Sequence, residues 1–228
     1  MSGVRRPLRA LSTVLIIAGV LMLSDAALTV AWQEPVSGVY ARIVQGRLSD
    51  DLHKLELQRP SAVELAALEA LKGETRRMAF LARRLRVTAH PGDAVGRIRI
   101  PKIGANFVVV NGTDTVSLRK GPGIYDEVPF PGAPGTTAIA GHRTTYLAPF
   151  RKIDKLRRGD KITIEMPYGR FTYDVQRTRI VPPTEVSVIK RVSYDRLVLS
   201  ACHPLYSAAK RIVVFARLVG AQARGKAL

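Results

Sequence analysis

The sequence predicts a mostly β domain, built as a compact and largely antiparallel barrel or sandwich, behind a helical segment and an N-terminal membrane-spanning helix. An apolar run fills residues 11–32, and a block rich in alanine, leucine and charged residues follows it to about residue 87. Short β-branched runs separated by glycine and proline occupy the remainder. The chain of 228 residues has room for one moderate domain with appendages, which excludes two large domains.

The first element is the apolar run at residues 11–32, which is 22 residues long. At about 1.5 Å per residue, a helix of this length crosses a hydrocarbon core roughly 30 Å thick. The tail at residues 1–10 carries three arginines, so the positive-inside rule keeps it in the cytoplasm and places the later residues outside. Trp32 then lies at the outer interface. We therefore expect a single-pass cell-membrane protein whose folded domain is extracellular.

A cleaved signal peptide is the alternative for the same segment. Residues 11–23 form a short apolar core, and small residues follow at Ala26 and Ala27. Asp25 is unfavourable in an anchor, since a carboxylate in mid-membrane costs about 2.5 kcal/mol or more. Mass spectrometry of the cell-associated protein separates the two, because a mature chain that begins near Ala27 rules out the anchor.

Residues 33–90 are predicted to form a helical stalk or linker. The block contains little glycine, and its apolar residues recur at helical intervals. Ser61 with Glu64 matches a capping box, which marks the start of a helix. Five arginines lie between residues 76 and 86, where we expect a solvated helix face; contact with lipid headgroups or an anionic wall polymer is the alternative.

Strands replace helices at about residue 89, and the predicted catalytic domain covers residues 91–220, followed by a tail at 221–228. Its β-branched residues alternate with polar ones between turn signals, which is typical of short antiparallel strands. One short helix is expected near residues 148–156. Beyond two strands near residues 98–100 and 107–109, strands are expected at residues 136–140, 161–165, 170–179, 196–201 and 211–219.

The chain is strongly basic, with 36 lysines and arginines against 18 acidic residues, a net charge of +18. Residues 91–228 hold 23 basic and 10 acidic residues, a net charge of +13. No nucleic-acid recognition motif accompanies this charge, and the expected topology places the domain outside the cell, so we expect no nucleic-acid partner. The charge is read as a solubilising surface, with attraction to teichoic acids or anionic lipids as the alternative.

The chain has one cysteine, Cys202, so an intramolecular disulfide and any multi-cysteine metal site are excluded. It follows an apolar run at the expected junction of a strand and a loop. A buried, inert cysteine is the ordinary interpretation of a lone thiol, but the polar neighbours and extracellular setting favour a nucleophile. A thiol nucleophile needs a proton-transferring partner and a group that stabilises an oxyanion.

Histidine and arginine suit these two tasks. His142 follows the small apolar run at residues 138–141, also at a strand end, whereas His53 and His90 lie in or near the stalk. His203 is adjacent to the cysteine, so in a strand its side chain faces the opposite way. Arg211 comes nine residues after the cysteine, a spacing suited to neighbouring antiparallel strands joined by a loop.

Four blocks carry a family resemblance over about residues 96–218: "RIRIPKIG", "KGPGIY", "AIAGHRTTYLAPFRKIDKLRRGD" and "CHPLYSAAKRIVV". They resemble the sortase family of membrane-anchored cysteine transpeptidases of Gram-positive bacteria. The "GHRTTY" and "CHP" contexts look most like class E, which is typical of actinobacteria. The resemblance implies a closed β-barrel with short helices, preceded by the helical stalk and the transmembrane helix.

Carried over by position, the resemblance makes Cys202 the nucleophile, His142 the proton-transferring histidine and Arg211 the catalytic arginine. The implied enzyme cleaves an LAXTG- or LPXTG-like sorting signal of surface proteins between Thr and Gly through a thioester, and then acylates the amine of a lipid II-type cell-wall precursor. No cofactor is implied. Some sortases bind calcium through clustered acids, but Asp126 and Glu127 are the only adjacent acidic pair in the catalytic part, so we predict no metal.

One position departs from the family pattern. Sortases usually carry threonine directly before the cysteine, whereas this chain has Ala201. Ser200 supplies a hydroxyl one residue earlier, but in a regular strand it lies on the face opposite to Ala201. The resemblance therefore leaves the efficiency of the enzyme and the pose of its substrate open.

Two other functions remain as alternatives. A peptidoglycan L,D-transpeptidase also combines cysteine, histidine and a β-rich domain, although its expected "HG" and "SxGC" contexts are absent. A non-catalytic scaffold would bind anionic envelope polymer through the basic outer domain. Turnover of stem peptides alone favours the first, and an unchanged phenotype after Cys202→Ala favours the second.

Overall fold

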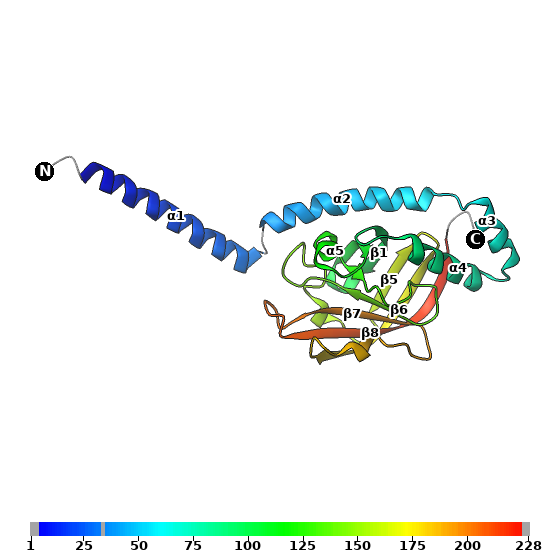
Figure 1. Ribbon diagram of the computed structural model, residues 1–228. Coiled ribbons are helices and arrows are strands. Elements are labelled where there is room, and N and C mark those ends of the chain that lie inside the picture. The colour runs from blue at the N-terminus through cyan, green and yellow to red at the C-terminus, as the bar shows by residue number, and fades with distance from the viewer. Residues whose placement is uncertain (1–4, 33–34, 225–228) are drawn as a thin grey trace.

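The computed structural model describes residues 5–32 and 35–224 and contains a closed eight-stranded β-barrel (Figure 1). Around the barrel the strands follow the order β1-β2-β3-β4-β7-β8-β6-β5. The mostly β prediction is therefore confirmed, and the barrel rather than the sandwich is the architecture. The strands are β1 Ala94–Ile100, β2 Ala105–Asn111, β3 Gly123–Ile124, β4 Thr136–Ala140, β5 Lys161–Met166, β6 Gly169–Val181, β7 Arg196–His203 and β8 Lys210–Ala223.

The interior of the barrel is filled by branched aliphatic and aromatic side chains. Ile98, Ile139 and Leu199 are fully buried, as is Phe150 in the loop that follows β4. Burial of one such side chain contributes about 1.5–3 kcal/mol, so these residues fix which strand faces point inward. The core thereby holds β4, β7 and β8 in register, and the predicted site residues lie on these strands or directly after them.

The prediction of a short helix near residues 148–156 is wrong. The segment forms loops and one short 3-10 turn, η2 Ile153–Lys155. Ala148 has a left-handed φ of 42°, and Pro149 disfavours helical backbone in the residue before it. A short helix occurs instead at α5 Thr115–Lys120, where the carboxylate of Asp114 accepts hydrogen bonds from two backbone N–H groups of the first turn.

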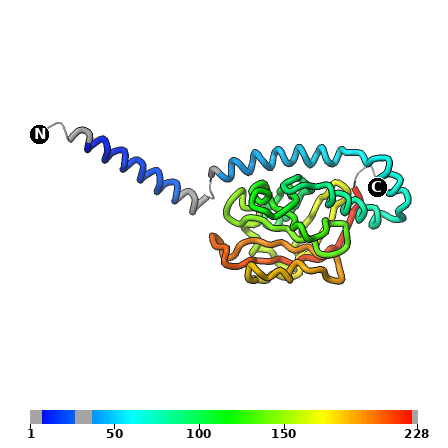
Figure 2. The backbone as a smooth tube through the Cα atoms, viewed as in Figure 1, coloured from blue at the N-terminus to red at the C-terminus, as the bar shows by residue number. Residues whose placement is uncertain are grey.

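Most of residues 35–88 are helical, as expected, and this part of the chain folds back onto the barrel (Figure 2). Its helices are α2 Pro35–Leu57, α3 Ala62–Ala70 and α4 Glu74–Thr88. The capping box of Ser61 and Glu64 is present at the start of α3. Leu48 and Leu52 of α2 form a small core with Val108 of β2 and its neighbours, so the helix lies along the barrel instead of standing away from it.

The side chain of Gln45 fixes α2 to β2 at Val108, where β3 does not pair with the strand. Its amide nitrogen donates to the carbonyls of Val108, at 3.1 Å, and Lys120, at 2.8 Å, while its oxygen accepts from the Val108 N–H at 2.8 Å. A Cβ at Gly121 would lie 2.5 Å from the same amide nitrogen and 2.8 Å from the backbone carbonyl of Val108, so a side chain there would displace this contact. Gln45 thus completes the hydrogen bonding of a buried strand residue as a further strand would.

The N-terminal helix α1 Arg5–Trp32 extends away from the barrel (Figure 1). Within the described parts of the chain, Leu8–Ala26 is the segment long and apolar enough to cross a membrane. This segment fits a single-pass anchor. The side chain of Trp32 and the outer ends of the two expected tails, residues 1–4 and 225–228, lie outside the described residues.

Candidate active site

The three predicted site residues lie on or directly after three neighbouring strands. β7 lies between β4 and β8 in the barrel. β4 runs parallel to β7, with Ala140 opposite Ser200, and β8 runs antiparallel to β7, with Arg211 opposite Cys202. The topology therefore brings His142, Cys202 and Arg211 to one end of the barrel, with the cysteine on the central strand.

Cys202 and Arg211 form a cross-strand pair, as their spacing predicts. Residues that face each other in antiparallel strands project to the same side, with Cβ atoms about 4.5–5.5 Å apart. Nη1 of Arg211 donates to the carbonyls of Ala208, at 2.9 Å, and Lys210, at 3.1 Å, in the connecting turn. Its Nε and Nη2 have no hydrogen-bond partner among residues 5–32 and 35–224, so these donors are available to a ligand at the half-buried thiol.

His142 leaves the sheet beside the cysteine. The N–H of Gly141 donates to the carbonyl of Ser200 at 3.0 Å, which continues the β4–β7 ladder by one residue. His142 comes two residues after Ala140, and Cys202 two residues after Ser200, which is the residue opposite Ala140. Both therefore lie at the same end of the barrel. Gly141 has no side chain because a Cβ there would lie 2.6 Å from the buried ring of Phe150.

The imidazole of His142 is half-buried and has an unused ring nitrogen. Nε2 is buried and makes no hydrogen bond within the described chain, which is rare for a buried polar atom. The ring of Tyr146 lies 5.2 Å away, centroid to centroid, at an angle of 42°. Burial, and then the positive charge of Arg119 in α5, lower the pKa of His142 below 6.5. The ring is therefore neutral at neutral pH and can accept a proton at Nε2.

The lowered pKa of His142 predicts the acid limb of the activity profile. Turnover is expected to rise with pH through a midpoint below 6.5. At lower pH the imidazole of His142 is already protonated and cannot take the proton of the Cys202 thiol. Arg119→Gln removes a like charge, so the pKa of His142 and the midpoint move upward, by less than about one pH unit. The measurement is kcat/KM between pH 4.5 and 8, with Arg76→Gln in α4 as control. A midpoint that stays in place in Arg119→Gln contradicts the assignment.

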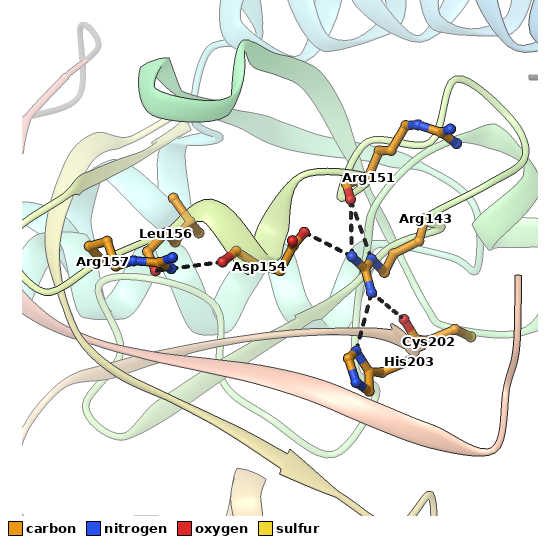
Figure 3. A network of polar contacts seen from close by, with 7 residues as sticks. All are labelled: Arg143, Arg151, Asp154, Leu156, Arg157, Cys202 and His203. Carbon is orange, nitrogen blue, oxygen red and sulfur yellow. Dashed lines mark hydrogen bonds and ion pairs between the residues drawn. The ribbon is translucent and has the colours of Figure 1, made fainter. Parts of the chain in front are cut away.

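Arg143, next to His142, ties the loop after β4 to the end of β7 (Figure 3). Its side chain is buried, and Nη1 donates to the carbonyl of Cys202 at 3.3 Å. Nη2 donates to Asp154 at 2.8 Å, and both Nε and Nη2 reach the carbonyl of Arg151. One planar guanidinium thus joins the loop after β4, the turn η2 and the end of β7.

Nη1 of Arg143 also contacts Nδ1 of His203 at 3.4 Å. A guanidinium carries only donors, so Nδ1 of His203 can take part in this contact only as the acceptor. His203 therefore faces the arginine and serves as an acceptor in the network. Sequence reasoning placed His203 on the other side of the strand from Cys202, but it did not find Arg143, whose partners lie up to 60 residues away.

Replacement of Arg143 by glutamine is expected to lower the free energy of unfolding by about 2–4 kcal/mol, because buried carbonyls and a carboxylate lose their donors. Arg143→Lys keeps the charge but cannot reach three groups at once, so an intermediate loss is expected. Urea unfolding of both variants measures this. Asp154→Asn is the matched control, since Asp154 is 39% exposed and loses less. Equal stability of Arg143→Gln and the wild type would refute the role of the network.

The residue before the cysteine supplies no hydroxyl to the site. Ala201 is buried within the main core, and the strand is regular through His203. The hydroxyl of Ser200 lies 3.1 Å from that of Tyr125, so it is engaged in a contact between β7 and the segment after β3. Ser200 therefore does not replace the hydroxyl that the usual threonine would bring to the position of Ala201.

Comparison with known proteins places this barrel in a family. The family model described as "Sortase domain" matches residues 98–219, which include all three site residues. Sortase D of Bacillus subtilis is 35% identical over 132 residues, which cover 56% of this chain and 65% of that protein. Sortase SrtE1 of Streptomyces coelicolor is 28% identical over 152 residues, 60% of this chain and 43% of that protein. The match thus spans less than two thirds of these curated relatives.

Solved structures give the same result over nearly their whole length. Sortase E from Streptomyces avermitilis is 33% identical and covers 61% of this chain and 99% of its own, with a TM-score of 0.54. The sortase D5 transpeptidase of Clostridium perfringens is 28% identical and covers 70% of this chain and 100% of its own, with a TM-score of 0.56. The sortase domain matches more than half of this chain, so the chain belongs to the sortase family.

Proposed function

We propose that this protein is a cysteine transpeptidase in which Cys202 is the nucleophile, His142 the general acid and base, and Arg211 the stabiliser of the oxyanion. The observation that supports this most is the register of β4, β7 and β8, which gathers these residues at one barrel end in a sortase-family chain. Within residues 5–32 and 35–224, Nε2 of His142 and the Nε and Nη2 donors of Arg211 have no hydrogen-bond partner, which suits them to these roles.

In the first half-reaction, His142 takes the proton of the Cys202 thiol, and the sulfur attacks the carbonyl carbon of the threonine in a Thr–Gly bond. The carbonyl oxygen becomes negative and accepts hydrogen bonds from Nε and Nη2 of Arg211. The C–N bond then breaks as the imidazolium returns its proton to the glycine amine. The product is a thioester between the threonine and Cys202, and the glycine-terminated fragment leaves.

In the second half-reaction, an incoming amine gives a proton to the neutral imidazole of His142 and attacks the thioester carbon. The C–S bond breaks, Cys202 leaves as thiolate, and the imidazolium restores its proton. One amide bond has been broken and one formed. The balance is complete with protein side chains alone.

The proposed substrate is an LAXTG- or LPXTG-like sorting signal at the C-terminal end of a surface protein, and the acceptor is the amine of a lipid II-type precursor. Assignment to class E is supported by two sortase E structures of Streptomyces avermitilis, at 32% and 33% identity. The 35% identity to a sortase D makes class D the alternative that a peptide panel must test.

The proposed arrangement in the envelope follows the domain order. The basic tail at residues 1–10 remains in the cytoplasm, residues 11–32 cross the membrane, and residues 33–90 lead to a catalytic domain at 91–220 on the outer side. The tail expected at 221–228 follows, and its first three residues belong to β8. The apolar helix Leu8–Ala26 supports the anchor, and the arginines before it support the orientation.

A trapping experiment tests the proposed reaction. The full chain in detergent is mixed with an LAXTG peptide at neutral pH, without an acceptor amine, and intact mass spectrometry is used to find the acyl adduct on Cys202. Addition of a cell-wall precursor amine should release the adduct as a new amide. A folded protein that forms no adduct with LAXTG or LPXTG peptides, or that turns over only peptidoglycan stem peptides, would overturn the proposal.

A further inference from the structure

The amino end of α2 contacts the loop that carries His142. The N–H of Tyr146 donates to Oγ of Ser37 at 3.4 Å. The rings of Tyr40 and Tyr146 meet edge to face, with centroids 6.4 Å apart and planes at 73°. A Cβ on Gly38 would touch the side chain of Leu147 at 3.9 Å. Three residues in the first turns of α2, at positions 37, 38 and 40, thus lie against this loop.

The loop has a backbone conformation that its own residues disfavour. Tyr146, Leu147 and Ala148 have φ values of 50°, 63° and 42°, in the left-handed region that residues with a Cβ rarely adopt. Such residues persist when surrounding contacts over-determine them, and they cluster at functional sites. The contacts from α2 fall on the first two of the three, so the helix supports the strained part of the loop.

Tyr146 connects this support to the imidazole. Its ring lies 5.2 Å from that of His142, and Nε2 of His142 has no hydrogen bond within the described part of the chain. The planes of the two rings meet at 42°, so the contact with Tyr146 holds the imidazole of His142 at a defined angle. A chain of contacts therefore runs from Tyr40 to Tyr146 to His142.

We infer that the first turns of α2 belong to the active site, and that Tyr40, acting through Tyr146, is a positioning residue for the imidazole of His142. This inference rests on the proposed function, which makes His142 the proton-transferring group. Tyr40 lies outside residues 98–219, where the sortase domain is matched. The helix is suited to this role because Gln45, five residues later, fixes it to β2.

The kinetic test compares three variants of the full chain in detergent. Tyr40→Leu is expected to lower kcat about tenfold with KM changed by less than about twofold, because the imidazole loses its orientation while the peptide site is untouched. Tyr40→Phe keeps the ring contact and should retain nearly full kcat. Ile43→Ala, on the same helix at 53% exposure, is the control. Tyr40 is 48% exposed, so its replacement opens no core cavity.

A second measurement reads the imidazole directly and is independent of turnover. With ring-labelled histidine, NMR should show the His142 resonances shifted in Tyr40→Leu and unmoved in Ile43→Ala, with His142→Gln used for assignment. The inference requires both results: full kcat in Tyr40→Leu, or a fall in kcat with unmoved resonances, overturns it. If the wild type forms no thioester, the proposed reaction fails, and unmoved or shifted resonances still decide whether α2 orients the ring.

Discussion

Cys202→Ala is expected to eliminate turnover of a sorting-signal peptide, with a loss of at least about 10⁴-fold, because the variant has no atom that can form the thioester. The thiol is half-buried at the end of β7, so its removal leaves only a small change in packing. We therefore expect the unfolding free energy to change by less than about 1 kcal/mol.

The measurement combines initial rates with intact mass spectrometry, which should show the peptide adduct on the wild type and none on the variant. Cys202→Ser separates chemistry from shape, since a hydroxyl is a far weaker nucleophile than a thiol in the same position. Turnover by Cys202→Ala at more than about a hundredth of the wild-type rate would show that another group carries the reaction. Intact binding of envelope polymer without any turnover in either protein would favour the scaffold alternative.

Arg211→Ala is expected to lower kcat about 10²- to 10³-fold, the usual cost of removing one donor to a developing oxyanion. The effect should appear in kcat more than in KM, because the negative charge exists only after the attack on the carbonyl. Arg211→Lys should recover part of the loss, since lysine keeps the charge without the planar fork.

Lys210→Ala is the matched control for Arg211→Ala. It removes the same charge from the adjacent position of β8, and its exposed side chain projects to the opposite face of the strand. We expect Lys210→Ala to change kcat by less than about threefold. Equal losses at the two positions would mean that the local positive charge, and not the placement of the guanidinium beside Cys202, supports the reaction.

Much of the barrel could be predicted from local patterns. The alternating β-branched residues around Ile164 and Phe171 predict strands. The apolar side chains of each alternation are the ones that point into the core. Cys202 and Arg211 could be placed as a pair because a spacing of nine residues suits neighbouring antiparallel strands joined by a loop. The helix at Thr115–Lys120 was missed, although the capping side chain of Asp114 was a readable signal.

The contacts that complete the candidate site could not be predicted, since they depend on how distant segments pack. Arg143 reaches a carbonyl 59 residues away, and the N–H of Tyr146 meets a hydroxyl 109 residues earlier. The charge of Arg119 in α5 acts on His142, 23 residues later in the chain. No local periodicity encodes these pairings. The left-handed backbone at residues 146–148 could not be predicted either, because none of these residues is glycine.

The docking of α2 also sets the reach of the enzyme. Ser37, which already touches the loop of His142, comes five positions after Trp32, the last residue of α1. Even a fully extended chain of that length covers only about 17 Å. If α1 crosses the membrane, the thiol works in a thin layer above the lipid surface, where precursors that are themselves membrane-bound reach a high effective concentration. Selection would then favour substrates still held by the bilayer over proteins that diffuse freely beyond it.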